Sequence, residues 1–145
     1  MSLLSEQDAI EVRERLKPMI APVRLVHFTQ ELNLEYGRET RELLEELAGL
    51  SSQLSLEVHN FQLEKEKAAE YGVDTVPATV VRDGHDRDHG HGIRFLGLPA
   101  GYEFASLLDA ILMVSKGDSG LSPDSRKKLA SVSQPVHLQV FVTPT

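Results

Sequence analysis

The sequence predicts an α/β fold built as a three-layer sandwich, in which helices flank a mixed four-stranded β-sheet. Three observations support this fold class. Some segments repeat apolar residues at helical spacing, whereas others alternate or run continuously apolar, as strands do. These patterns follow one another in the order strand, helix, strand, helix, hairpin, helix. A proline also stands directly before a β-branched run, in Val76-Pro77-Ala78-Thr79-Val80-Val81, where it suits the first residue of a strand.

An additional helix is predicted before the sheet, because Ser5 suits an N-cap and Pro18 ends the helical pattern at Lys17. The elements that follow are a strand over 23–28, a helix from 34 or 36 to 50, a strand over 54–59, a helix over 64–71, a strand over 76–82, a strand over 93–96 and a helix over 102–116. The first two strands are expected to be parallel and the hairpin to add antiparallel strands. Gly37 is unusual, since it stands where a strong helix former is expected.

A helix and a strand are predicted after this unit. Ser122-Pro123 is an N-cap and N1 pair that opens a helix to about Ala130, and residues 136–142 alternate as a strand. This succession resembles the helix and strand that end at Thr29, with chance similarity as the alternative. An unfinished repeat cannot bury its own strand. We therefore expect residues 136–142 to pair with the main sheet or with a second copy of the chain.

Composition excludes several classes of function. The 145 residues carry 15 basic and 22 acidic side chains, and the net charge of −7 argues against a nucleic-acid or membrane-surface binder. No apolar run approaches the roughly 20 residues of a membrane helix, and the N-terminus lacks the pattern of a signal peptide. A cytoplasmic location is therefore expected. The absence of cysteine excludes disulfides, thiolate metal sites and thiol catalysis within this chain.

Three stretches carry a resemblance to a known family, namely 71–78 (Tyr-Gly-Val-Asp-Thr-Val-Pro-Ala), 92–104 (Gly-Ile-Arg-Phe-Leu-Gly-Leu-Pro-Ala-Gly-Tyr-Glu-Phe) and 140–145. With these residues the chain resembles the glutaredoxin-like protein disulfide oxidoreductases, which consist of two thioredoxin-fold units in tandem. It also resembles the N-terminal domain of the alkyl hydroperoxide reductase flavoprotein subunit. The resemblance covers nearly the whole chain. It implies a thioredoxin-like unit with an N-terminal helix over 1–117, a linker over 118–121, and the helix and first strand of an incomplete second unit over 122–145.

The resemblance also implies where an active site would lie. In that family a Cys-x-x-Cys pair follows the first strand of an active unit, at a helix N-terminus that lowers the pKa of the thiol. The corresponding positions here are Leu34-Glu35-Tyr36-Gly37, and neither Leu34 nor Gly37 has an ionisable sulfur. The expected site is therefore degenerate and has no catalytic residue. The pair of the second unit would follow Thr145.

Two features near this region are candidates for substrate binding. In thioredoxin-like folds the residue before the proline, here Val76, offers its backbone N–H and C=O groups to an extended peptide by β-augmentation. The alternative is that Pro77 serves the fold alone, and the Val76–Pro77 bond is a candidate for the cis form. Tyr36 would hydrogen-bond a partner, with simple packing as its alternative.

The hairpin loop carries His85, His89 and His91 close to two aspartates. Imidazole and carboxylate groups together suit zinc, nickel or copper(II). The alternative is a solvated hairpin tip, and the three glycines of the loop argue against a preorganised metal site. We therefore predict no metal and no other cofactor.

From the sequence we predict a catalytically silent thioredoxin-like domain that acts as a scaffold or docks a peptide in thiol–disulfide redox homeostasis. Its expected partner is a redox-active thioredoxin-like unit or a protein substrate. Two alternatives stay open. One is a fragment of an active thiol–disulfide oxidoreductase whose Cys-x-x-Cys lies beyond Thr145. The other is a stand-alone interaction protein that forms a homodimer through the C-terminal strand.

Overall fold

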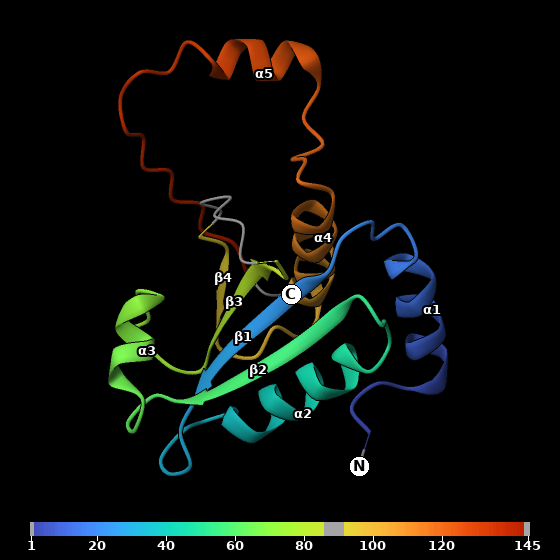
Figure 1. The fold of residues 1–145 in the computed structure, drawn as a ribbon, viewed down its shortest axis with the longest axis vertical. Coiled ribbons are helices and arrows are strands. Elements are labelled where there is room, and N and C mark those ends of the chain that lie inside the picture. The colour runs from blue at the N-terminus through green and yellow to red at the C-terminus, as the bar shows by residue number, and fades with distance from the viewer. Residues whose placement is uncertain (1, 86–91, 144–145) are drawn as a thin grey trace.

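The secondary structure follows the predicted ranges closely in a computed structural model that describes residues 2–85 and 92–143 (Figure 1). The elements are α1 (Glu6–Leu16), β1 (Val23–Thr29), α2 (Gly37–Ala48), β2 (Leu54–Asn60), α3 (Lys65–Glu70), β3 (Ala78–Asp83), β4 (Arg94–Leu96), α4 (Tyr102–Lys116) and α5 (Pro123–Leu129). None of the helices in the described ranges combines the length and the apolar character that crossing a membrane requires.

The four strands form one mixed sheet with the order β2-β1-β3-β4. Strand β1 is parallel to β2 and antiparallel to β3, and β4 extends the sheet antiparallel to β3. Because β1 is flanked by strands on both sides and by helices on both faces, all but one of its residues are buried. The predicted mixed four-stranded sheet is therefore confirmed.

Helices cover the two faces of the sheet unequally, as Figure 1 shows. The larger hydrophobic core joins α1, α2 and α4 to one face and includes Leu16, Leu25, Leu44, Leu107 and Ile111. The smaller core lies on the other face, where Ala68 of α3 packs with Val26, Phe28, Val73, Ala78 and Val80. This division into helices, sheet and helix confirms the predicted three-layer sandwich. The short helix α3 leaves part of its own face of the sheet without a helical cover.

Strand β3 begins later than predicted. The strand was expected to open at Val76, but the ladder starts at Ala78, which pairs with Phe28 of β1. Pro77 has no N–H to donate to a ladder, and its carbonyl instead accepts a hydrogen bond from Gly97 N–H at 2.8 Å. The Val76–Pro77 peptide bond is cis.

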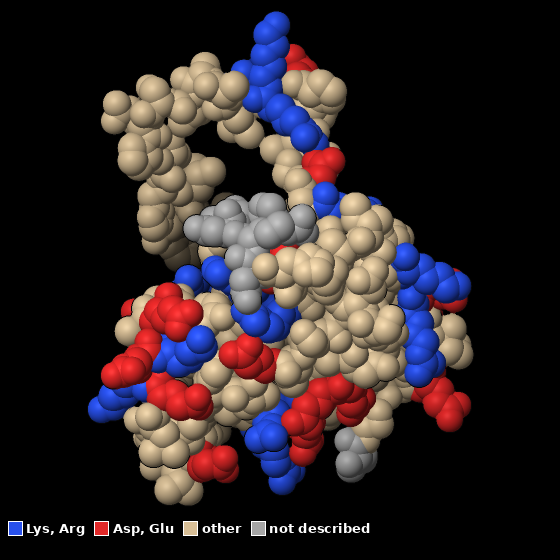
Figure 2. All heavy atoms as spheres, viewed as in Figure 1, with Lys and Arg blue, Asp and Glu red and all other residues tan. Residues whose placement is uncertain are grey.

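Residues 118–143, which we call the arm, stand apart from the sheet. Helix α5 forms as expected, with Ser122 as N-cap accepting from Ser125 N–H and Pro123 as the first helical residue. No residue of the arm is buried, and Figure 2 shows an opening between the arm and the body of the protein. Residues 136–142 form no strand, so the prediction that they pair with the main sheet is wrong. Pairing with a second copy stays a prediction.

Gly84 brings the end of β3 against the residue that precedes β1. Its N–H donates to the Pro22 carbonyl at 2.8 Å, and a Cβ at position 84 would lie 2.9 Å from that carbonyl oxygen. We expect Gly84→Ala to lower the free energy of unfolding by about 1–3 kcal/mol, because two backbones must separate. Gly49 is the control, since its φ is −69° and a Cβ at that position would meet nothing closer than 3.4 Å. Urea denaturation should show Gly49→Ala unchanged or stabilised; equal losses in both variants would contradict this explanation.

Candidate functional site

The helix that follows β1 begins in an unusual backbone conformation. Tyr36, the N-cap of α2, has a left-handed φ of 58°, and Asn33 in the preceding loop has a φ of 56°. A left-handed backbone is uncommon for a bulky residue and needs support from its surroundings. Here the Tyr36 carbonyl accepts hydrogen bonds from the Thr40 N–H at 2.9 Å and from the Thr40 hydroxyl at 2.6 Å. Thr40 therefore fixes the first turn of α2.

Leu34 and Gly37, the two positions expected to be degenerate, lie in direct contact. A Cβ added to Gly37 would lie 2.6 Å from Cδ2 of Leu34, which is closer than real Cβ contacts allow. The leucine side chain thus occupies the space that any side chain at position 37 would need. This contact explains why glycine stands at the first position of α2, where local helix propensity alone disfavours it.

A polar hollow of about 430 Å³ opens over these two residues. Its charged side chains are Glu31, Arg38, Glu39 and Arg41, and Thr29 closes it at the end of β1. None of the side chains that line the hollow contains sulfur. The hollow therefore offers hydrogen bonds and charge but no thiol chemistry. At this hollow Leu34 is half-buried and Gly37 is buried.

A larger groove of about 600 Å³, which we call the apolar groove, lies beside the polar hollow. It is built where the N-terminal segment and α1 meet α2, α4 and the turn before α4. Its apolar lining consists of Leu3, Leu4, Val12, Leu43, Leu98, Ala100, Phe104, Ala105 and Leu108. Tyr36, with 53% of its surface exposed, lines both the apolar groove and the polar hollow, as does Glu39.

The rim of the apolar groove is mostly acidic. Asp8, Glu11 and Glu39 line it together with a single cation, Arg15. Arg15 already forms a salt bridge of 2.6 Å with Asp109. Asp8 belongs to the N-terminal capping box of α1, and its hydrogen bonds with Ser5 lower the pKa of its carboxyl group. The rim therefore carries negative charge at neutral pH.

The structure places Val76 and Pro77 outside both linings. Pro77 is buried, and Val76 is half-buried against the smaller core on the α3 face. Within the described residues no backbone hydrogen bond of Val76 is found, so its N–H and C=O groups are available. The Gly97–Pro77 hydrogen bond links this loop to the turn that leads into the apolar groove. Of the three predicted binding residues, the structure thus brings only Tyr36 into a hollow.

His27 is a buried polar residue that the sequence reasoning did not single out. Its Nδ1 lies 3.1 Å from the hydroxyl oxygen of Thr79, and its Nε2 has no hydrogen-bond partner among the described residues. Burial disfavours the charged imidazole and lowers the pKa to about 4. A hydrogen bond from the imidazole to the backbone of Ala78 opposes this shift, and the positive charge of Arg41 reinforces it. His27 is therefore neutral at physiological pH. The signal in the sequence is a histidine that stands between Val26 and Phe28 in the central strand.

One of the three metal candidates, His85, lies within the described residues. His85 is exposed at the end of β3, where its N–H donates to Asp83 Oδ1 at 2.7 Å. His89 and His91 lie outside the described residues. Over 2–85 and 92–143, no three histidine, aspartate or glutamate side chains are grouped closely enough to hold a metal ion.

The mixed sheet, the helices on its two faces and the helix that starts directly after β1 define a thioredoxin fold, here in a chain without cysteine. No family model matches the sequence, and a search of curated proteins finds no match. Solved structures do match. A protein disulfide oxidoreductase from Aeropyrum pernix K1 superposes with a TM-score of 0.74 at 28% identity. That match covers 88% of this chain and 54% of the other.

The alkylhydroperoxide reductase protein AhpF from Enterococcus faecalis V583 superposes with a TM-score of 0.77 at 25% identity, covering 88% of this chain and 60% of that one. The separately solved N-terminal domain of the same protein gives a TM-score of 0.76 at 25% identity, over 87% and 59% of the two chains. This chain is a thioredoxin-fold protein related to the disulfide oxidoreductase and to that N-terminal domain. It spans between half and two thirds of the length of these relatives.

Proposed function

We propose that this chain is a catalytically silent thioredoxin-like unit that docks a protein segment in cytoplasmic thiol–disulfide redox homeostasis. The absence of cysteine removes the thiol chemistry, and the related folds supply the context. The observation that carries the proposal is the apolar groove beside the start of α2, with Tyr36 on its side. The partner is a redox-active thioredoxin-like unit or a protein substrate.

The groove defines the chemistry of the docked segment. Leu98 and Phe104 offer apolar surface, while Asp8 and Glu11 on the rim attract positive charge. A segment with bulky apolar residues next to lysine or arginine therefore fits best. The free backbone groups of Val76 would extend the contact by pairing with the main chain of the same segment.

The test uses two matched tyrosine variants and a fluorescent peptide whose leucine and phenylalanine residues are flanked by lysines. Tyr36→Asn keeps a residue that tolerates a left-handed backbone and removes the ring from the groove. We expect at least about fivefold weaker binding, because an aromatic ring that is buried in an interface contributes at least about 1 kcal/mol. Tyr102→Asn is the control, since Tyr102 is 79% exposed and lies outside the groove. No saturable binding to the unaltered chain, or equal affinity for all three proteins, would refute docking at this groove.

A second candidate is a unit of an active thiol–disulfide oxidoreductase. The observation that favours it is the extent of the structural match, because this chain covers 54% of the length of the Aeropyrum oxidoreductase. In this proposal a Cys-x-x-Cys follows Thr145 in the intact protein and performs the electron transfer. Sequencing the coding region past Thr145 tests the proposal directly. The chain as given should not accelerate the reduction of insulin by dithiothreitol, and a clear acceleration would refute its catalytic silence.

A third candidate is a homodimer formed through residues 136–142. The observation that favours it is the exposure of five apolar side chains in this segment, which range from Val136 at 66% to Phe141 at 90%. Apolar surface of this extent normally marks an interaction site. Light scattering should then give twice the chain mass of 16.1 kDa, and a monomer at all concentrations would exclude the dimer.

A further inference from the structure

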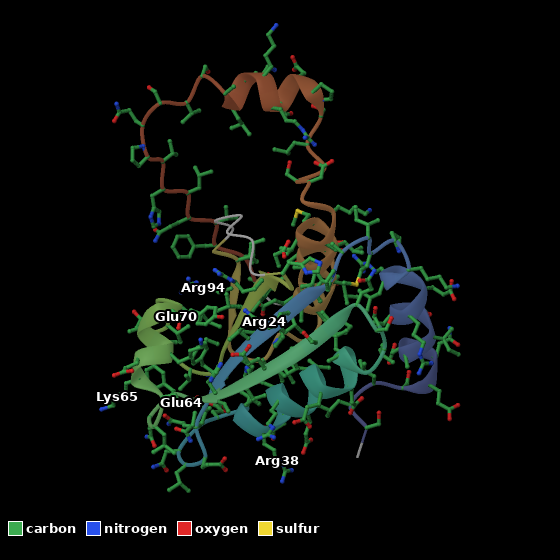
Figure 3. All side chains as sticks on the ribbon, in the orientation of Figure 1. Arg24, Arg38, Glu64, Lys65, Glu70 and Arg94 are labelled. Atoms are coloured by element: carbon green, nitrogen blue, oxygen red, sulfur yellow. The ribbon has the colours of Figure 1, made fainter. Side chains whose placement is uncertain are left out.

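Arginines from three adjacent strands gather on the α3 face of the sheet. The strand register places Arg24 of β1 directly opposite Arg82 of β3. It also places Arg94 of β4 opposite Val80, which is two residues from Arg82 and therefore on the same face. Figure 3 shows Arg24 and Arg94 beside the strands near the Glu70 end of α3. The arginines thus occupy the part of this face that the short helix α3 does not cover.

Tyr71 contacts two of the arginines in this cluster. Its hydroxyl group lies 3.3 Å from Nη2 of Arg24, and the guanidinium carbon of Arg82 lies 5.3 Å from the centre of its ring. Arg94 is held separately, because its Nη1 donates to the Gly72 carbonyl at 2.7 Å. The ring of Tyr71 is itself packed against Phe28, 5.7 Å away. The guanidinium groups are therefore positioned by contacts within the fold and do not extend freely into solvent.

The cluster is only partly neutralised. Arg24 pairs with Glu57 at 3.4 Å. Among the described residues, neither Arg82 nor Arg94 forms an ion pair with a carboxylate, although the chain has 22 acidic residues and a net charge of −7. Like charges on directly opposed strand positions destabilise a sheet. Arg82 and Arg94, which form no ion pair with a carboxylate of the described residues, are thus suited to an anionic ligand.

We propose that this arginine cluster binds the carboxylates of an acidic polypeptide segment. Side chains from three neighbouring strands are spread over about 10 Å, which matches several carboxylates along a segment better than one tetrahedral anion. The planar donor forks of Arg82 and Arg94 suit bidentate pairing with carboxylate groups. The cluster lies on the opposite face of the sheet from the apolar groove, whose lining includes Val12 and Leu108 of the larger core. It therefore provides a second binding surface, independent of docking at Tyr36.

The test measures fluorescence anisotropy of a labelled oligoglutamate peptide at low salt with the full chain. The double variant Arg82→Gln/Arg94→Gln should bind at least about tenfold more weakly, because two charge-assisted hydrogen-bonding groups are lost. The matched control removes two exposed cations elsewhere, as Arg13→Gln/Lys127→Gln, and should bind within about twofold of the unaltered chain. Equal weakening in both double variants would show non-specific attraction and overturn the proposal.

Three further measurements separate the remaining outcomes. Inorganic pyrophosphate should compete poorly with the peptide, and competition at equal concentration would assign the cluster to small phosphate anions and overturn the acidic-segment proposal. Arg82→Lys/Arg94→Lys retains the charge but not the planar fork, so it should bind between the unaltered chain and the glutamine variant. If the glutamine variant does not fold, the lysine variant takes its place in the binding test. Tyr36→Asn should leave oligoglutamate affinity unchanged, so failure of this proposal is distinct from failure of docking at the groove.

Discussion

Replacing Phe28 by alanine is expected to lower the free energy of unfolding by about 3–5 kcal/mol. Phe28 is fully buried on the α3 face of β1, where its ring stacks on His59 at 5.2 Å between centroids and contacts Tyr71 at 5.7 Å. Removing the ring leaves a cavity in the smaller of the two cores, which has few other large side chains to fill it. Urea denaturation followed by circular dichroism measures the loss.

Phe141 is the matched control for this experiment. It is 90% exposed in the arm, so Phe141→Ala should change the free energy of unfolding by less than about 0.5 kcal/mol. The contrast between two phenylalanines in one chain isolates the contribution of burial. A loss above about 1 kcal/mol at Phe141 would show that the arm is packed in solution. Repeating the measurement at several protein concentrations would then show whether a second copy covers it, since dimer stability depends on concentration.

The stability of the unaltered chain is expected to fall by up to about 3 kcal/mol between pH 6.5 and pH 4 because of His27. The pKa of His27 is lowered to about 4 in the folded chain, against about 6.5 in an unfolded one. Between these values the unfolded state binds a proton that the folded state does not. Stability is therefore complete above about pH 6.5 and decreases as the pH falls toward the folded pKa.

His27→Asn should remove this part of the pH dependence while keeping a polar group for Thr79 to contact. The asparagine variant is expected to be less stable than the unaltered chain at neutral pH but to lose less stability on acidification to about pH 4.5. His137→Asn, in the exposed arm, should retain the full slope. Carboxylates with lowered pKa values, such as Glu46 and Glu64, lose their stabilising contribution mainly below about pH 4.5, so the window above it reports on His27. An unchanged slope in His27→Asn would contradict the assignment.

Elements with strong local signals were predictable. Helix α4 has the predicted bounds, Tyr102 to Lys116, because an amphipathic pattern is closed at both ends by Gly101 and Gly117, each with a positive φ. The alternating segment over 136–142 shows the limit of such signals. Alternation indicates a chain able to form a strand, but a strand also needs a neighbour to receive its hydrogen bonds, and the described part of the chain supplies none.

The candidate site depended on contacts between distant segments. The apolar groove is lined by Leu4 and Leu108, which are far apart in the sequence, so no local pattern could reveal it. The position of Tyr36 follows from its left-handed backbone, which sequence patterns predict poorly for a tyrosine. Leu34 and Gly37 were singled out by resemblance alone, and their direct contact is visible only in the fold.

That contact restricts how a thiol pair could be introduced at these two positions by mutation. Gly37→Cys alone would force its Cβ into Leu34, so the change is expected to destabilise the start of α2 before any chemistry is gained. Leu34→Cys alone creates a thiol with no second thiol to resolve a mixed disulfide. The order leucine first and glycine second reduces the steric penalty, because only the Cβ of residue 34, at 3.3 Å, then stays close to a Cβ at position 37. Its first step confers no redox cycle. The effect of a cysteine at either position therefore depends on the residue at the other, and neither single substitution gives a working dithiol.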